Sequence, residues 1–378
     1  AFGPFVTDMY LPSLPAMADY FSASLPMVQM GLTTSMIGLA LGQIFFGPLS
    51  DKYGRRPLLL VSMLLFIVST LFCLFAPDIY SFVTLRLIQG IAGAGGIVIS
   101  RSVATDKFSG KELAKMLAVI GAINGVAPVA APVIGGLLTG SVGWQGIFMI
   151  LLFIGILLGI GCIRFKESLP AEKRSKTGVW ATFRSFGIIV HNRRYMLYVF
   201  QLAFAQGILF AYIASSPFII QQHYGFSPFA FSICFAVNAV AIGVAAALSV
   251  KFRRTENGTL TGCIGMLVFA VLQMAALYSG CGFWTYELLM FALLFMMGLT
   301  FTSSTTLAMD CERRYAGAAS ALLGALCFAS GGIVSPLVGL GDILISTGVT
   351  FVICAVCSLL CALWAVKRTG AKVALCRI

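Results

Sequence analysis

Twelve long apolar runs decide what this chain can fold into. They cover residues 1–19, 31–49, 57–76, 79–104, 112–138 and 144–164, and then residues 193–218, 229–250, 259–279, 285–308, 316–340 and 343–366. A helix needs roughly 20 apolar residues to cross a bilayer, and most runs reach that length. Only 10% of the 378 residues are charged, whereas soluble domains carry about 25%. The pattern therefore predicts an all-α membrane protein with twelve transmembrane helices.

The apolar runs fall into two groups of six, separated by the longest polar connection. Transmembrane β-strands would show about ten residues of strict alternation, whereas these runs are continuous. We therefore expect two six-helix bundles, which places the major divisions of the chain as follows: an N-terminal bundle at 1–165, a cytoplasmic linker at 166–192, a C-terminal bundle at 193–366 and a cytoplasmic tail at 367–378.

Lysine and arginine orient the predicted helices. Of the 25 such residues, all except Arg86 and Arg101 lie in alternate connections or in the tail. The positive-inside rule assigns those connections to the cytoplasm. This predicts a multi-pass protein of the inner membrane with both termini cytoplasmic. A net charge of +12 would suggest nucleic acid as the partner of a soluble protein, but the one-sided placement argues against that partner.

Two short sequences recur at equivalent places in the two halves. Residues 49–53 (LSDKY) return as residues 248–252 (LSVKF), and residues 132–135 (PVIG) return as residues 336–339 (PLVG). Together they favour a parallel repeat about an axis along the membrane normal. Folds of this kind place a solute cavity between the halves and rock around it.

Several motifs resemble those of a known transporter family. Residues 47–56 resemble the loop signature of the major facilitator superfamily between spans two and three, and residues 85–90 resemble its fourth-span motif. Residues 125–136 resemble the fifth-span motif of antiporters. Residues 7–12 and 215–218 are similar to the Bcr/CflA branch of drug:proton antiporters. The resemblance implies the major facilitator fold, alternating access, protons as coupling ion with no other cofactor, and substrates such as chloramphenicol, bicyclomycin or endogenous metabolites.

The distribution of the 13 acidic residues singles out Asp8. Eight are predicted to be cytoplasmic, and four lie near the predicted outward ends of spans, namely Asp19, Asp78, Glu287 and Asp342. Only Asp8 is predicted to lie inside a span. At 1.5 Å per residue it is about 16 Å from Asp19, and Arg86 reaches a similar depth. An ionisable residue at this depth is a functional hypothesis by default.

We predict that Asp8 carries the coupling proton beside Arg86. Burial favours the neutral form of an acid, whereas a nearby Arg favours the ionised form, so a carboxyl that moves between such surroundings can bind and release a proton. The alternative is a structural ion pair.

Further residues are assigned by their position or by the resemblance. The predicted contacts of a small drug-like substrate are Thr7, Leu11, Met36, Gln89, Asn124, Gln206, Phe210 and Tyr212. The resemblance implies an intracellular latch made of Gly47, Asp51, Gly54, Arg55, Arg56 and Asp106. It also implies an antiporter motif with Gly125, Pro128, Pro132, Gly135 and Gly136. A lone polar residue in a span is about as often a link between helices as a ligand contact.

The sequence thus predicts a drug:proton antiporter that works in the lipid bilayer as a monomer. A proton-coupled importer of the same fold is the nearest alternative, and a membrane enzyme or sensor is a remote one. The two histidines, His191 and His223, are predicted on opposite sides of the membrane, so we expect neither a metal site nor an enzyme. Because the sequence does not begin with Met, we expect its natural start to precede Ala1.

Overall fold

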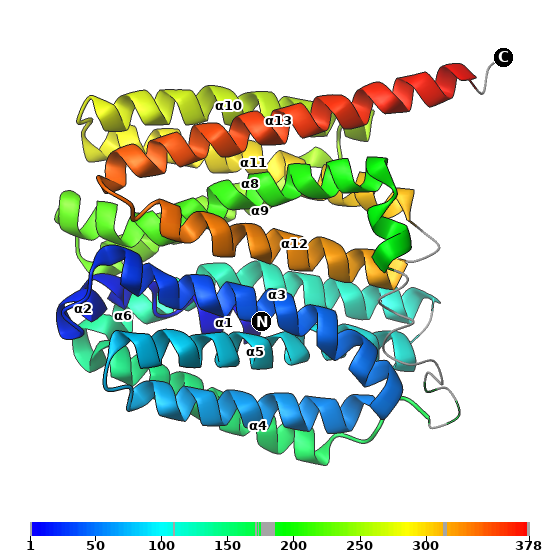
Figure 1. Cartoon of the computed structure of the whole chain (residues 1–378), viewed down its shortest axis with the longest axis horizontal. Helices are drawn as coiled ribbons and strands as arrows, with labels where there is room; N and C mark the ends of the chain where they lie inside the picture. Colours follow the sequence, from blue (N-terminus) through cyan, green and yellow to red (C-terminus); the bar gives the residue numbers. More distant parts are fainter. Residues whose placement is uncertain are drawn as a thin grey trace. The chain divides into compact units, whose positions relative to one another are not determined.

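Helices make up almost all of the described chain. The computed structural model describes residues 2–108, 110–170, 172, 174, 186–312 and 316–375, and these ranges contain no strand. The first part of the chain holds α1 (Phe2–Asp8), the 3₁₀ turn η1 (Leu11–Ser13), α2 (Leu14–Tyr20), α3 (Leu25–Tyr53), α4 (Arg55–Leu74), α5 (Ile79–Lys107) and α6 (Gly110–Arg164). The later part holds α8 (Arg193–Phe218), the π-helical turn η3 (Ile219–His223), α9 (Pro228–Ser249), α10 (Thr255–Tyr278), α11 (Phe283–Cys311), α12 (Ala316–Leu337) and α13 (Ile343–Leu375) (Figure 1).

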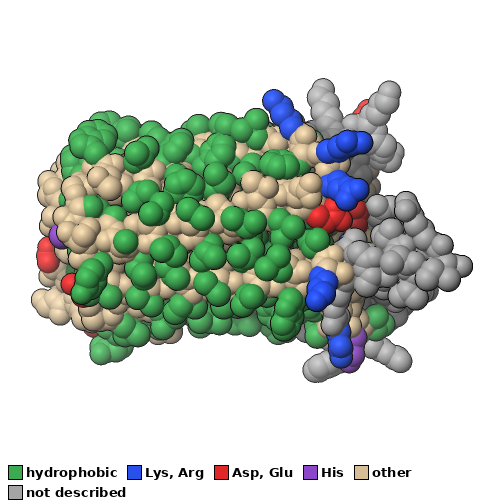
Figure 2. Space-filling view, turned by 90° about the horizontal axis from the view of Figure 1, so that it is seen from above, with side chains coloured by type: hydrophobic (Ala, Val, Ile, Leu, Met, Phe, Trp, Pro, Cys, Tyr) green, Lys and Arg blue, Asp and Glu red, His purple; other side chains and the backbone are tan. Residues whose placement is uncertain are grey.

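The described residues form 10 separate helical stretches that are long and apolar enough to cross a membrane. The two other predicted spans are present in a different form. The first span is divided into α1, η1 and α2, and the fifth span is joined to the sixth in α6. Hydrophobic side chains cover the flanks of the helices, and lysine and arginine gather at helix ends (Figure 2).

Prolines explain why the first span is interrupted. A proline inside a helix lacks the N–H donor, and its ring clashes with the carbonyl four residues earlier. Pro12 therefore conflicts with the carbonyl of Asp8, where α1 ends. Pro15 lies in the first turn of α2, where proline is tolerated. The chain consequently turns at Met9 and Tyr10, directly after Asp8.

One glycine interrupts α6 between the fifth and sixth predicted spans. Gly143 has φ 65° and ψ −173°, a conformation that is essentially restricted to glycine. The helix is kinked there, close to the predicted boundary at residues 139–143.

Two compact units emerge from the packing. The first unit comprises residues 1–183 and 216–236, and the second comprises residues 184–215 and 237–378. In the first unit α3 and α5 cross closely, since a Cβ at Gly38 would overlap the Leu87 carbonyl and a Cβ at Gly90 would overlap the Ser35 carbonyl.

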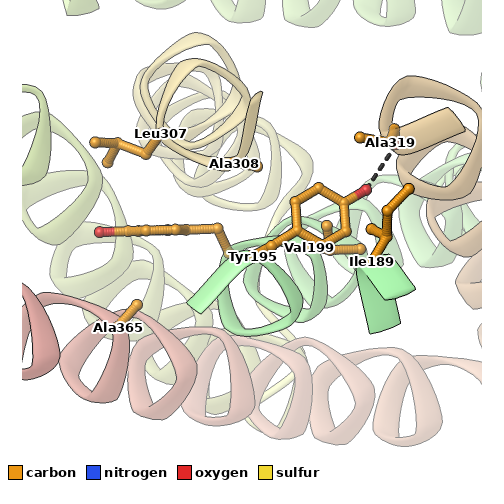
Figure 3. Close-up of a cluster of buried hydrophobic side chains, with 8 residues drawn as sticks. Ile189, Tyr195, Val199, Leu307, Ala308, Ala319 and Ala365 are labelled. Carbon is orange, nitrogen blue, oxygen red and sulfur yellow. Dashed lines mark hydrogen bonds between the residues drawn. The ribbon is translucent and has the colours of Figure 1, made fainter. Parts of the chain in front are cut away.

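A buried cluster holds the second unit together where α8 begins and α11 ends. Tyr195 is fully buried, and its hydroxyl donates to the Ala319 carbonyl oxygen at 2.6 Å, which ties α8 to α12 (Figure 3). Leu307 and Ala308 of α11 and Ala365 of α13 complete the contact.

Candidate functional site

Asp8 lies at the last residue of α1, where the first span is interrupted. Its side chain is buried, with 6% of the residue exposed. The Arg86 guanidinium acts on the carboxyl through its charge. The prolines that end α1 therefore place an acid inside the helix bundle rather than at its surface.

Arg86 of α5 is fully buried and is held by backbone carbonyls. Its Nε donates to the Gly31 oxygen of α3 at 3.3 Å, and its Nη2 donates to the Val6 oxygen of α1 at 3.2 Å. Val6 belongs to the last turn of α1, whose carbonyls have no helical partner. The guanidinium also lies over the Tyr10 ring, 4.5 Å from its centroid. Arg86 thus caps the interrupted helix.

A short chain of hydrogen bonds orients Arg86 from its other side. Arg86 Nη1 donates to Gln89 Oε1, and Gln89 Nε2 donates to Thr70 Oγ1 at 2.7 Å. Thr70 in turn donates to the Phe66 oxygen of α4 at 2.7 Å. Gln89, which the sequence suggested as a substrate contact, has both ends of its amide bonded to protein. Sequence reasoning missed Thr70, which nothing in its local pattern marks.

Asp8 and Arg86 do not form a direct salt bridge. Between described side chains, ion pairs occur from Arg55 to Asp51 and Asp106 and from Arg174 to Glu167. Three of the five N–H groups of Arg86 donate to carbonyl and amide oxygens, and its charge acts on Asp8 without an ion-pair contact.

The described part of the antiporter motif packs against the interrupted span. A Cβ at Gly135 would overlap the carbonyl oxygen of Met9, the residue after Asp8. A Cβ at Gly136 would meet Ser232 and the Pro228 oxygen of α9, which belong to the same unit. Pro132 is buried beside them. Three predicted site residues lie outside the part of the chain whose packing is described: Gly125, Pro128 and the predicted substrate contact Asn124.

The other predicted substrate contacts fall into two groups, one in each unit. In the first, Leu11 and Met36 are buried, and the Thr7 hydroxyl donates to the Gly3 oxygen at 3.2 Å. In the second, Phe210 packs on Phe328 with ring centroids 5.9 Å apart.

Two polar members belong to the second group. Gln206 is half-buried, and within the described chain its Oε1 has no hydrogen-bond partner. The Tyr212 hydroxyl accepts a hydrogen bond from Asn238.

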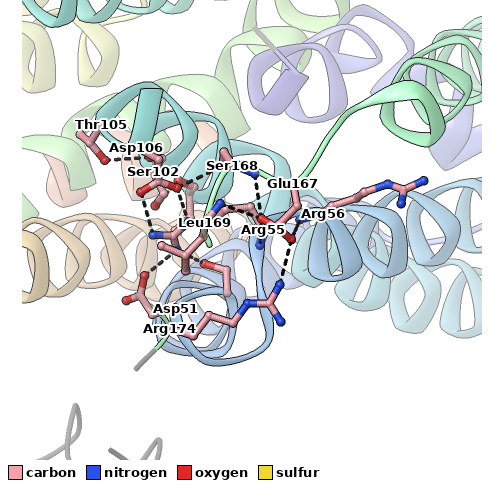
Figure 4. A network of polar contacts seen from close by, with 12 residues as sticks. Asp51, Arg55, Arg56, Ser102, Thr105, Asp106, Glu167, Ser168, Leu169 and Arg174 are labelled. Atoms are coloured by element: carbon pink, nitrogen blue, oxygen red, sulfur yellow. Dashed lines mark hydrogen bonds and ion pairs between the residues drawn. The ribbon is translucent and has the colours of Figure 1, made fainter. Parts of the chain in front are cut away.

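The residues implied for a latch come together where α3 ends and α4 begins (Figure 4). Arg55 Nη1 lies 2.5 Å from Asp51 Oδ1, and Arg55 Nε lies 2.9 Å from Asp106 Oδ2. Gly54 has φ 103°, which favours glycine at the turn between the helices. Arg56 donates to the Ile163 oxygen at 2.9 Å. Gly47 lies beside Val98, where α3 passes α5.

Glu167, which sequence reasoning missed, completes this cluster. Its carboxylate accepts from the backbone N–H groups of Arg55, Arg56, Ser168 and Leu169 at 3.0–3.1 Å. It therefore caps the start of α4, whose first N–H groups lack helical partners. Burial raises the pKa of Glu167, but the four N–H donors outweigh it and hold the pKa below its usual value. The available signal was an acid directly after Lys166, at the start of the linker.

Glu287 lies near the start of its helix, as the sequence predicted, but its carboxyl is enclosed by packing. It lies in the second turn of α11, and its Oε1 accepts from Asn238 Nδ2 at 2.8 Å. Its Oε2 is buried. The sequence placed Glu287 at an outward helix end because it lies close to the start of its apolar run. Packing by α9, which the sequence does not specify, encloses it.

Comparison with known proteins identifies the family of this chain. The Major Facilitator Superfamily matches residues 1–336. An uncharacterized MFS-type transporter YdgK of Bacillus subtilis is 39% identical over 90% of this chain and 86% of its own length. A bicyclomycin resistance protein homolog of Haemophilus influenzae is 29% identical over 89% and 85%, and a chloramphenicol resistance protein of Pseudomonas aeruginosa is 26% identical over 90% and 80%.

Solved structures agree on the fold. A bacterial homolog of the human lysosomal transporter Spinster has a TM-score of 0.78 with this chain at 17% identity, covering 97% of this chain and 95% of its own. The chain is therefore a multi-pass membrane transporter, not an enzyme. It belongs to the Major Facilitator Superfamily and is similar to the bicyclomycin and chloramphenicol resistance proteins of its Bcr/CflA type.

Proposed function

We propose that this transporter exports drugs or other amphiphilic small molecules in exchange for protons. The names of its relatives, which include resistance to bicyclomycin and to chloramphenicol, support drug export. The positive-inside rule supports an inner-membrane location with both termini in the cytoplasm. In this proposal each chain works as a monomer and needs no cofactor beyond the proton.

The observation that carries proton exchange is the buried carboxyl of Asp8 at the break in the first span. An ionised side chain inside a membrane protein is costly unless a partner or water neutralises the cost. Arg86 stabilises the ionised form through its charge and without an ion-pair contact, and three of its N–H groups are bonded to Gly31, Val6 and Gln89. Asp8 is therefore balanced between two forms, and binding a proton is the simplest way to change between them.

Exchange follows if the substrate and the proton compete for Asp8. A cationic drug would pair with the carboxylate, and a neutral drug would hydrogen-bond to it, so that either displaces the proton. One proton that enters across about 100 mV supplies about 2.3 kcal/mol, enough for a roughly fifty-fold solute gradient. Gly135 lets α6 touch the carbonyl of Met9, so movement of α6 would alter the surroundings of Asp8 directly.

Replacing Asp8 tests the proposal. The purified chain is reconstituted into vesicles with an imposed pH gradient, and movement of radiolabelled chloramphenicol is followed. Asp8→Asn should abolish transport driven by the pH gradient while leaving exchange of labelled for unlabelled chloramphenicol. Full gradient-driven transport by Asp8→Asn would contradict the role of Asp8.

Asp19→Asn is the matched control. Asp19 lies in the same interrupted span, but its side chain is exposed, so this variant should transport like the wild type. The direction of movement separates exchange from import: an antiporter moves chloramphenicol against the inward flow of protons, and a proton-coupled importer moves it with that flow.

A further inference from the structure

The second unit contains a buried acid that the proposed mechanism does not use. Glu287 of α11 accepts a hydrogen bond from Asn238 Nδ2 of α9 at 2.8 Å. The same Nδ2 donates its other hydrogen to the Tyr212 hydroxyl of α8 at 3.1 Å. Asn238 and Tyr212 are at most 1% exposed. Three helices of one unit thus hold a carboxyl, an amide and a phenol in a fixed row.

Two acceptor atoms in this row have no donor within the described residues. Glu287 Oε2 and Asn238 Oδ1 are both buried and without a hydrogen-bond partner there. A buried acceptor without a partner carries a large desolvation cost, and the cost is far greater when the group is ionised. The row is therefore incomplete as it stands, and its missing component is a donor at Glu287 Oε2.

Among the described residues, no ion pair includes Glu287, and burial and the hydrogen bond from Asn238 are what act on it. Helices α8 and α9 contribute the phenol of Tyr212 and the neutral amide of Asn238. Helix α10 also packs on α11, but its charged residue, Glu256, lies in its first turn, at the end away from the start of α11. The helix dipole would stabilise a negative charge most strongly in the first turn of α11, and Glu287 lies in the second turn.

We propose that Glu287, held by Asn238 and Tyr212, is a second proton-binding site of this transporter. A proton taken from water bonds to Oε2, which removes the negative charge and turns the unpartnered acceptor into a donor. Its release leaves the carboxylate held by Asn238 alone. A proton fits this site better than a metal ion, because the described residues contain no group of three or more His, Cys, Asp or Glu side chains that could hold a metal.

The place of Glu287 suggests how the proton reaches it. It lies four residues after the start of α11, about 6 Å along the helix axis. Arg193 and Arg194 begin α8, and Lys251, Arg253 and Arg254 lie between α9 and α10. By the order of the helices, these basic residues lie on the side of the unit opposite to the start of α11. Glu287 is therefore near the outer face if these basic connections are cytoplasmic, which is the face from which protons would enter.

The inference rests on the proposed proton exchange and deepens it. Exchange of two protons for each solute would raise the limiting gradient at about 100 mV from roughly fifty-fold to roughly 2,500-fold. Glu287 would also place one site in each unit, since Asp8 belongs to the first unit.

Infrared difference spectroscopy on the purified full chain tests proton binding without any substrate. Spectra are recorded between about pH 5 and pH 9, where a protonated carboxyl gives a C=O band that ionisation removes. We expect a titrating band that persists in Asp8→Asn, disappears in Glu287→Gln and is unchanged in the exposed control Asp19→Asn. Identical spectra of the wild type and Glu287→Gln over this range would overturn the proposal.

A second variant keeps the carboxyl and changes only its support. Asn238→Ala removes the donor that stabilises the ionised form, so the band of Glu287 should persist and titrate at a higher pH than in the wild type. An unchanged titration would overturn the role assigned to Asn238 in the site.

Transport in vesicles then separates the two proposals. With chloramphenicol as probe, Glu287→Gln should lower the ratio of protons to solute from two to one, whereas Asp8→Asn should stop gradient-driven transport. Loss of the infrared band in Glu287→Gln together with full transport by Asp8→Asn would refute the role of Asp8 and leave the Glu287 site standing. A ratio unaffected by Glu287→Gln would overturn its part in coupling.

Discussion

The two units each bury an acid, but they surround it differently. In the first unit Asp8 is the last residue of α1, where proline interrupts the span, and the charge of the fully buried Arg86 acts on it. In the second unit Glu287 lies in the continuous helix α11, and its hydrogen-bond donor among the described residues is the neutral Asn238. A cation favours the ionised form of a nearby acid, and an uncharged buried site favours the neutral form.

This difference assigns distinct tasks to the two acids. An acid near a cation can release its proton inside the protein, as exchange with a substrate demands. An acid among neutral groups holds its proton until water reaches it, which suits a site near a membrane face. The repeat of the fold therefore does not impose a repeat of the chemistry, because each half has its own polar residues around its acid.

The largest expected effect comes from removing the cation. Arg86→Ala should lower the free energy of unfolding by about 3 kcal/mol or more, since it leaves the carbonyls of Val6 and Gly31 and the amide of Gln89 buried without their charged donor. Thermal unfolding in detergent, followed at neutral pH, measures this loss.

Glu287→Gln is the matched change in the other unit. It replaces the carboxyl by an amide of similar size that cannot ionise, so we expect a change below about 1 kcal/mol. Equal losses in Arg86→Ala and Glu287→Gln would contradict the contrast between a site built around a charge and a site built without one.

Glu167 is an acid of the opposite kind, because four backbone N–H groups donate to its carboxylate and stabilise the ionised form. Glu167→Gln should cost about 1 kcal/mol at neutral pH, as for the loss of a helix cap. The four N–H donors lower the pKa of Glu167 in the folded protein. Its stabilisation is therefore complete above the unfolded value near pH ~4.3 and is lost as the pH falls through the folded value.

The melting temperatures of the wild type and Glu167→Gln should therefore converge in acid. The wild type and Glu287→Gln should instead diverge as the pH rises, because ionisation penalises the buried Glu287. Glu172→Gln, which removes an exposed acid of the same segment, is the control for the loss of a charge there. A gap between the wild type and Glu167→Gln that widens in acid would contradict the capping role.

The helices and their number were accessible from the sequence because hydrophobic length is a direct physical requirement of the bilayer. The break at Asp8 was not predicted, although its cause is written in the sequence: Pro12 excludes the Asp8 carbonyl from a regular helix. The break was missed because the run is apolar throughout, and a hydropathy value does not reflect that proline lacks a backbone N–H.

The site was predictable only in its charged members. Asp8 and Arg86 stand out because charge is rare within spans, whereas Thr70 and Asn238 are ordinary polar residues whose roles depend on which helix packs beside them. Glu287 shows the same limit, because its place near the helix start was predictable from the sequence whereas its enclosure depends on tertiary packing.

The smallest expected shift in titration concerns the far end of the row in the second unit. Tyr212→Phe removes the acceptor of one Asn238 hydrogen, which leaves that N–H without its present partner. We expect a loss of about 1 kcal/mol in unfolding free energy. Asn238 Nδ2 is then less firmly held against Glu287, so the infrared band of Glu287 should titrate at a slightly higher pH. The shift should be smaller than in Asn238→Ala.

Tyr195→Phe, which loses a bond to the Ala319 carbonyl elsewhere in the same unit, should cost similar stability without moving the band. If Tyr195→Phe shifted the band as much as Tyr212→Phe, the effect would be general loosening of the unit, and Tyr212 would have no specific part in the site.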